Sequence, residues 1–353
     1  MLNTPAWPLN IKEQPACLAY ALKLWDNCKS FVYLYSVYGG CESGAGIRSL
    51  QGRGISPPYT LYFLSMTRNR ELSIFIDESG ELSAPCRLNS CKDAFYVVSL
   101  VFHDQDVDIS NLVDDLNYEL DIMKIPGISK NHALHSYNLI RGERPYESLD
   151  IRERHKLFNK AVDFAGSCAR IGVAGKMCVI DRRHYCEPDS SYDVNCRISE
   201  SRRQAMEAKI HDWLDDLILD NRDDLCTFDT IKVYYDNGQK WLGDLIHESF
   251  SCNVVEDELV FKEKVSPSQY KLFQVADLLC TYSLLCKKRA VSDYTKNDMR
   301  FFDSSFKVRN HGNDRNRGNS LRQSHSAAAT DRQVDVLARR FKKLTENSIP
   351  HVR

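Results

Sequence analysis

The sequence predicts an α/β protein in which a mixed β-sheet carries helices on its faces. Apolar runs of strand length alternate with stretches whose apolar residues recur at helical spacing. The first two strands follow each other through a short polar connection typical of a hairpin, whereas helices separate most of the later ones. A hairpin followed by helix-linked strands indicates a sheet with both antiparallel and parallel pairs.

The expected strands are apolar runs that end in turn or polar residues: 72–77, 94–102, 170–181, 230–238 and 259–265. The expected helices show apolar residues on one side: 108–123, 152–165, 200–220 and 268–288. A further amphipathic pattern over residues 331–344 predicts a helix near the C-terminus.

The chain divides by composition into a long central domain and two flanking segments. Residues 1–65 are poor in charge and rich in Gly, Tyr and Pro, so we expect a dispensable N-terminal extension; a small subdomain is the alternative. Residues 66–306 hold the strands and helices of the expected domain. Residues 307–353 form a basic, polar tail, in which 307–326 are expected to lack structure.

Composition limits the classes of partner. The formal net charge of −1 gives no overall attraction to nucleic acid or to anionic membranes, so any site for a polyanion must be a local patch. The 13 cysteines contain no CxxC pair, which argues against a zinc cluster and predicts reduced thiols in a cytoplasmic protein. No apolar run reaches the ~18–20 residues of a membrane span. The oligomeric state stays open.

Acidic side chains occur where two of the expected strands end. Asp77 and Glu78 close the first strand, and Asp236 follows the fourth. If these strands are parallel neighbours, their carboxyl ends lie about 5 Å apart. The carboxylates then face the crevice where open α/β sheets bind ligands.

A third aspartate, Asp277, lies within the apolar stretch FQVADLLCTYSLL, with Gln274 on the same helix face. A carboxylate among apolar residues is costly unless it is paired or binds a cation. Carboxylates gathered without cations raise one another's pKa, and Mg²⁺ or Mn²⁺ would relieve that repulsion. Two such ions about 3.5–4 Å apart serve phosphodiester hydrolysis, which is the function we expect.

Each acid also has a structural explanation when taken alone. Asp77 could end a strand, and Asp-Asn-Gly at 236–238 is a turn signature. Asp277 could form a buried salt bridge with Lys262 or Lys264. Only the conjunction of the three acids favours a metal site.

His135 lies in a polar segment with basic residues nearby, among them Arg141 and Arg144. A histidine there could transfer protons or contact a phosphate, and an exposed loop histidine is the alternative. The two arginines, with Lys262 and Lys264, are candidate contacts for a phosphate backbone.

Five motifs in order resemble those of the domain of unknown function 3800 family: IFIDESG, LHSYNLIRGERPYESL, VYYDNGQ, YKLFQVADLLCTYSLL and MRFFDSSF. The resemblance covers residues 72–306. It implies an RNase H-like fold, a five-stranded mixed sheet flanked by helices, and a metal-dependent nuclease that uses Mg²⁺ or Mn²⁺ on DNA or RNA.

The resemblance assigns the site residues by position. They are Asp77 with its neighbour Glu78, the histidine His135, the strand-end Asp236, and Gln274 with Asp277 on the closing helix. An acidic residue often precedes the histidine in that family. Here the run is Ala133-Leu134-His135, so a fourth carboxylate is missing unless Glu78 or Glu143 supplies it. The number of metal ions therefore stays open.

Two other functions remain. The missing acid favours a catalytically inactive RNase H-like module that binds nucleic acid or protein, and carboxylates more than about 8 Å apart would support it. A phosphatase with a strand-end aspartate as nucleophile ranks last, because Ser79 stands where such enzymes carry a second acid.

Overall fold

The computed structural model describes residues 69–350, apart from 81, 83–85, 88–93, 126, 130–131, 186–194, 197–198, 237, 255–257, 263–264 and 304–318. The described residues belong to one compact unit, Arg68–Arg353. The expected N-terminal extension, residues 1–65, lies outside the described part of the chain.

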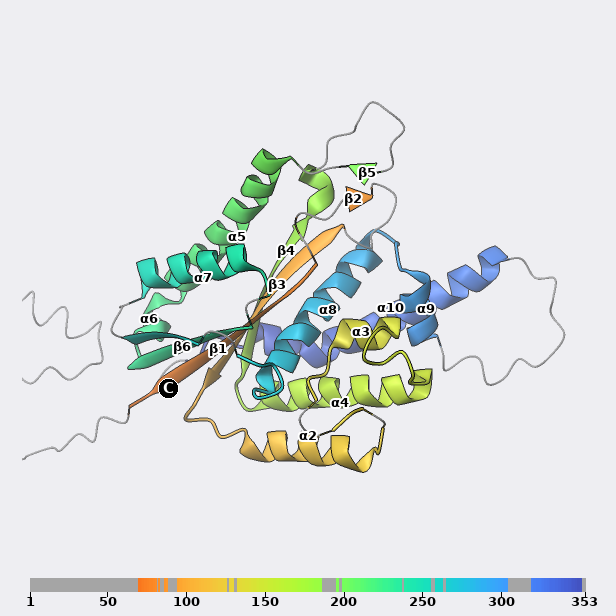
Figure 1. Ribbon diagram of the computed structural model, residues 1–353, viewed down its shortest axis with the longest axis horizontal. Helices are drawn as coiled ribbons and strands as arrows, with labels where there is room; N and C mark the ends of the chain where they lie inside the picture. Colours follow the sequence, from red (N-terminus) through yellow and green to blue (C-terminus); the bar gives the residue numbers. More distant parts are fainter. Residues whose placement is uncertain are drawn as a thin grey trace, which may run out of the picture. The chain divides into compact units, whose positions relative to one another are not determined.

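A five-stranded mixed sheet forms the centre of this unit (Figure 1). Its strands, in spatial order, are β4 (Ala174–Asp181), β3 (Phe95–Asp104), β1 (Glu71–Ser79), β6 (Thr230–Tyr235) and β7 (Leu259–Lys262). The pairs β4–β3 and β3–β1 are antiparallel, and the pairs β1–β6 and β6–β7 are parallel. The order and directions are those of an RNase H-like topology, which confirms the expected fold class.

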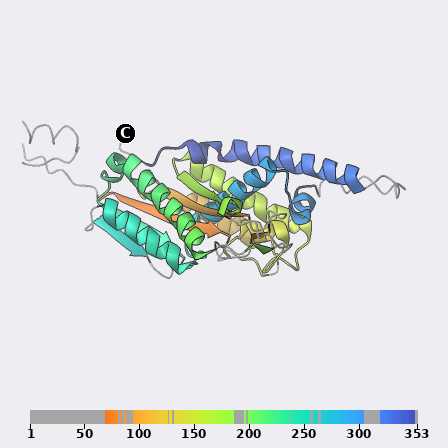
Figure 2. The same ribbon diagram turned by 90° about the horizontal axis from the view of Figure 1, so that it is seen from above.

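Helices cover both faces of the sheet (Figure 2). One face packs against α5 (Glu200–Asp220) and α7 (Lys240–Asn253), and the other against α8 (Leu272–Ala290) with α4 (Ile151–Arg170) and α2 (Ser110–Ile122) beyond it. Successive side chains of β1 point to opposite faces, so Ile74 and Ile76 join the first core and Phe75 the second. None of the described helices combines the length and the apolar content that a membrane crossing needs.

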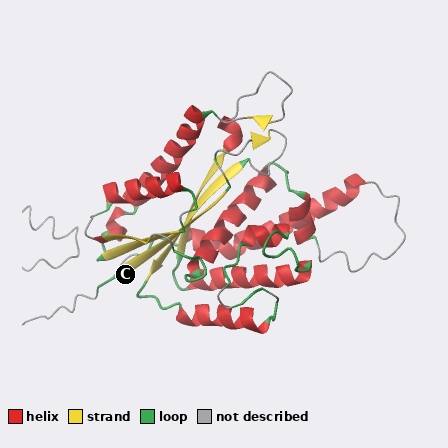
Figure 3. Cartoon of the chain, viewed as in Figure 1, coloured by secondary structure: helices red, strands yellow, loops and turns green. Residues whose placement is uncertain are grey.

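Several short elements were not predicted. They are β2 (Cys86–Arg87) with its partner β5 (Asn195–Cys196), the helices α3 (Ser136–Arg141), α6 (Arg222–Leu225) and α9 (Lys296–Phe302), and the 3₁₀ turn at Arg182–Tyr185 (Figure 3). Elements of two to seven residues are too short to show a period in the sequence. Helix α7 was also missed, although its 14 residues are long enough to show one.

The C-terminal helix is longer than its amphipathic pattern predicts. Helix α10 spans Asn319–Glu346, so it begins inside the stretch 307–326 that composition predicted to lack structure. Val334, Leu337, Phe341 and Leu344 are buried in the core beneath α4 and α8. These side chains make the end of the chain part of the same packed core as the sheet.

We predict that Phe341→Ala lowers the free energy of unfolding by about 3–5 kcal/mol, because it removes a buried aromatic ring and leaves a cavity. Arg339→Ala, on the exposed side of the same helix, should change it by no more than about 0.5 kcal/mol. Urea denaturation measures both. Equal, small effects would show that α10 does not complete the core.

Candidate metal centre

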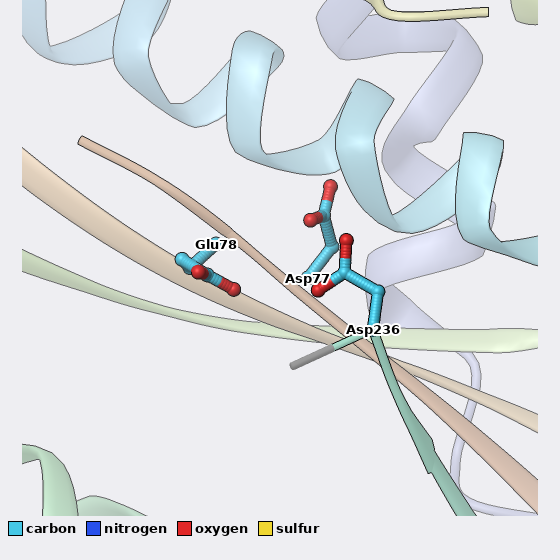
Figure 4. A group of neighbouring side chains, drawn as sticks. All are labelled: Asp77, Glu78 and Asp236. Carbon is cyan, nitrogen blue, oxygen red and sulfur yellow. The ribbon is translucent and has the colours of Figure 1, made fainter. Parts of the chain in front are cut away.

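Asp77 and Asp236 lie side by side near the carboxyl ends of two neighbouring parallel strands, β1 and β6. In the β1–β6 ladder Ile76 pairs with Tyr235, so the next residue on each strand is an aspartate. Strand β1 continues to Ser79, two residues past Asp77, whereas β6 ends at Tyr235. Figure 4 shows the two aspartate side chains close together at this edge of the sheet.

Glu78 completes a cluster of three acids. Asp77, Glu78 and Asp236 each offer a carboxylate oxygen, and these oxygens all lie within 4.8 Å of one another. Because successive strand residues alternate, Glu78 projects from β1 on the side opposite to Asp77 (Figure 4). One of its oxygens, Oε2, is buried and has no hydrogen-bond partner among the described residues.

The turn after β6 shapes the space around Glu78. The backbone N–H of Gly238 donates to Asp236 Oδ1 over 3.1 Å, and that of Gln239 donates to the Tyr235 hydroxyl over 2.7 Å. A Cβ at position 238 would clash with Glu78 Oε1 and lie 3.3 Å from Asp236 Oδ1. Glycine therefore lets the turn close over the acids. Asp236 and Gly238 of the Asp-Asn-Gly signature thus both belong to the surroundings of the cluster.

The acids destabilise one another's charged forms. Burial, followed by the charges of Asp277, Glu78 and Asp236, raises the pKa of Asp77 well above its usual range. Burial and then the charge of Asp236 raise the pKa of Glu78 to about 7. Burial also raises the pKa of Asp236. The neighbouring His135 partly offsets the shift of Asp236, but no lysine or arginine among the described residues counteracts the raised pKa values of the three acids.

Asp277 lies on α8 beside the cluster rather than within it. Among the neighbouring carboxylates, Asp277 raises the pKa of Asp77 most. Its own carboxylate accepts the backbone N–H of Ser136 over 2.6 Å, and Oδ1 lies 3.9 Å from His135 Nδ1. The salt bridge to Lys262 considered from the sequence does not form, and Lys262 is exposed on the edge strand. Lys264 lies outside the described residues.

Two contacts that the sequence did not reveal hold α8 over the strand end. Ser99, the partner of Asp77 in the β1–β3 ladder, donates its hydroxyl to the carbonyl of Ala276 over 2.8 Å. The thiol of Cys280 donates to the carbonyl of Asp77 over 3.5 Å. Both bonds flank Asp277 along the helix and so fix its register above β1.

His135 is positioned by a buried tyrosine. It precedes α3, and its backbone N–H donates to the Tyr146 hydroxyl over 2.9 Å. That hydroxyl donates in turn to the carbonyl of Ala133, and Tyr146 is completely buried. The His135 ring is about half exposed, with Asp277 as its neighbour. The histidine is thus held at the rim of the centre by the segment before a short helix.

Gln274 supports this histidine segment. Its side chain is buried one turn before Asp277 and donates Nε2 to the carbonyl of His132 over 3.4 Å. Lys271 donates to the same carbonyl over 3.1 Å. Glu143 does not supply a fourth carboxylate to the cluster in this arrangement, because it pairs with Arg141 over 2.6 Å.

No protein-family model and no curated protein matches the chain. The resemblance to the domain of unknown function 3800 family therefore stays a prediction. The fold and the arrangement of the acids carry the functional argument.

We predict that the metal-free protein loses stability as the pH rises from about 4.5 to 7. In that range the Glu78 carboxyl keeps its proton in the folded state, whereas the unfolded chain has released it. Unfolding therefore releases a proton and becomes more favourable as the pH rises, until the folded carboxyl ionises at its pKa of about 7. The loss is on the order of 3 kcal/mol, at about 1.4 kcal/mol per pKa unit.

Urea unfolding at pH 5 and pH 8 in a chelator measures this loss. Glu78→Gln should reduce the pH dependence, to which Asp77 and Asp236 still contribute, whereas Glu248→Gln, at an exposed position of α7, should leave it unchanged. An unaltered dependence in Glu78→Gln would contradict the assignment of the shift to Glu78.

Proposed function

We propose that this protein is a metal-dependent nuclease that hydrolyses phosphodiester bonds of DNA or RNA at the carboxyl ends of β1 and β6. One observation carries the proposal. Three carboxylates with oxygens within 4.8 Å of one another lie at the edge of an RNase H-like sheet, their pKa values are raised, and no lysine or arginine among the described residues counteracts those shifts.

The donor set fits a hard divalent cation. Carboxylate oxygens are the ligands that Mg²⁺ and Mn²⁺ prefer, and mutual repulsion gives the acids a reason to bind one. The buried Glu78 Oε2 has an unused acceptor site among the described residues. Asp77, Glu78 and Asp236 would hold the metal, and Asp277 would complete its environment from α8.

The residues around the acids have separate roles in this proposal. A bound Mg²⁺ or Mn²⁺ supplies an activated water and stabilises the leaving oxygen. His135, half exposed at the rim, is placed to move a proton to or from solvent, and its Nδ1 lies 3.9 Å from Asp277 Oδ1. Ser99, Cys280 and Tyr146 keep these groups in place and do not contact the reacting atoms.

The alternative is an RNase H-like module that binds nucleic acid or protein without catalysis. Ala133, in place of the acid that precedes the histidine in the resembling family, favours it. A separation of more than about 8 Å between the aspartates would support this alternative, and the carboxylate oxygens of Asp77 and Asp236 lie within 4.8 Å of each other. Metal binding without hydrolysis would select this alternative.

We predict that Mn²⁺ binds the full chain and that Asp77→Asn or Asp236→Asn abolishes the binding, because each removes a charged ligand from the cluster. Isothermal titration gives the affinity and the number of ions, and Asp277→Asn shows whether α8 contributes a ligand. Asp220→Asn, at an exposed site of α5, is the matched control. A folded wild type that binds no Mn²⁺ would overturn the metal centre.

We predict cleavage of labelled DNA or RNA in the presence of Mg²⁺ or Mn²⁺, with none detectable for Asp77→Asn or Asp236→Asn. His135→Ala should lower the rate by about 10²–10⁴-fold, the usual contribution of a positioned acid or base. His184→Ala, whose side chain is 80% exposed, should leave the rate unchanged. Equal rates for the two histidine variants would remove His135 from the mechanism.

A further inference from the structure

A pocket of about 310 Å³ lies between α7 and the edge strand β7. Tyr235 lines it, and Tyr235 is the residue immediately before Asp236. The first residue of α7, Lys240, also lines it, so the pocket extends from the strand end that carries the acids toward the outer edge of the sheet. The pocket and the acids therefore share the carboxyl end of β6.

The lining of this pocket is net positive, opposite in sign to the acidic metal centre. Lys240 and Lys262 are exposed, and neither forms an ion pair with a carboxylate in the described part of the chain. Asp244 is the single acid among the described lining residues. With a net charge of −1, the protein has no overall field to attract a polyanion, so local cations must hold the substrate next to the acids.

An aromatic surface lies at the same place. The rings of His247 and Phe261 stack at 3.5 Å between centroids with 25° between their planes, and Tyr235 contributes a third ring to the lining. His247 is exposed and Phe261 partly exposed. Aromatic faces next to lysines are the features with which proteins bind unpaired bases along a phosphate backbone. The volume of about 310 Å³ lies at the lower end of the range of small-ligand pockets, about 300–1,000 Å³, as expected for a site that takes a single unit of a chain.

We propose that this pocket binds one unpaired nucleotide next to the scissile phosphate, so that the substrate is single-stranded nucleic acid. The base stacks on the His247–Phe261 surface, and Lys240 and Lys262 contact the adjoining phosphates. The inference rests on the proposed nuclease function for its orientation relative to the cut. The binding itself is measured independently of metal and of cleavage.

The test is fluorescence anisotropy of labelled oligothymidylate, oligouridylate and a DNA duplex of equal length, in a chelator. The full-length protein carries Asp236→Asn, which reduces the negative charge and prevents cleavage. We expect both single strands to bind more tightly than the duplex. Lys240→Gln with Lys262→Gln should weaken single-strand binding at least tenfold and reduce the slope of log affinity against log salt by about 1.4.

His247→Ala should weaken binding about fivefold or more through lost stacking. The matched control, Lys296→Gln with Lys342→Gln, changes two exposed lysines outside the pocket and should stay within about twofold. Duplex binding as tight as single-strand binding, or pocket variants equal to the control, would overturn the inference.

Titration of Mn²⁺ into the pocket variants, without Asp236→Asn, separates the two proposals. If the pocket variants still bind Mn²⁺ and their affinity for oligonucleotides is unchanged, the pocket proposal is wrong and the metal-centre proposal stands. If the wild type binds no Mn²⁺ but binds single strands through the two lysines, the proposed nuclease function is wrong and the protein is a single-strand-binding protein.

Discussion

The pairing of β1 with β6 is the interaction on which the rest of the site depends. A parallel ladder in the register Ile76–Tyr235 forces Asp77 and Asp236 to emerge as neighbours. Hydrogen bonds and apolar contacts along the two strands hold the carboxylates together against their repulsion. The packed sheet thus supplies the free energy that keeps the like charges close. The raised pKa values reflect how unfavourable it is to ionise these carboxyl groups.

A second set of contacts holds α8 and the histidine segment over these strands. The Ser99 hydroxyl and the Cys280 thiol bind α8 to the strands on either side of Asp277, and Asp277 accepts the backbone N–H of Ser136. The histidine segment is therefore tied to the helix, and the helix to the sheet. Rigid elements hold each of these groups, which is the usual requirement for a precise site.

The sequence predicts the strands well because they are long apolar runs, and one hairpin followed by helix-linked strands predicts a mixed sheet. It predicts that Asp77 and Asp236 meet only on the condition that their strands are parallel neighbours, and the β1–β6 ladder meets that condition. It did not predict the roles of Ser99, Tyr146 or Cys280, because hydroxyl and thiol groups in apolar stretches give no local signal. Their partners are 11 to 203 residues away in the chain.

The limits of prediction are also visible at the ends of elements. Composition assigned residues 307–326 to a disordered tail, but the last eight of them begin α10, whose later turns are buried by tertiary packing. Intrinsic helix preference is a weak guide where packing decides. Asp277 illustrates the same point, since its surroundings suggested a lysine partner and the fold provides a histidine and a backbone amide instead.

The position of α10 has a consequence for how the protein is made. Phe341 and Leu344 fill the core on the α8 face of the sheet, and Ile349, just after the helix, fills the core on the α5 face. During synthesis the strands and the acids emerge well before these residues. Neither apolar core is complete until position 349 has emerged from the ribosome, so both faces keep some apolar surface exposed during synthesis.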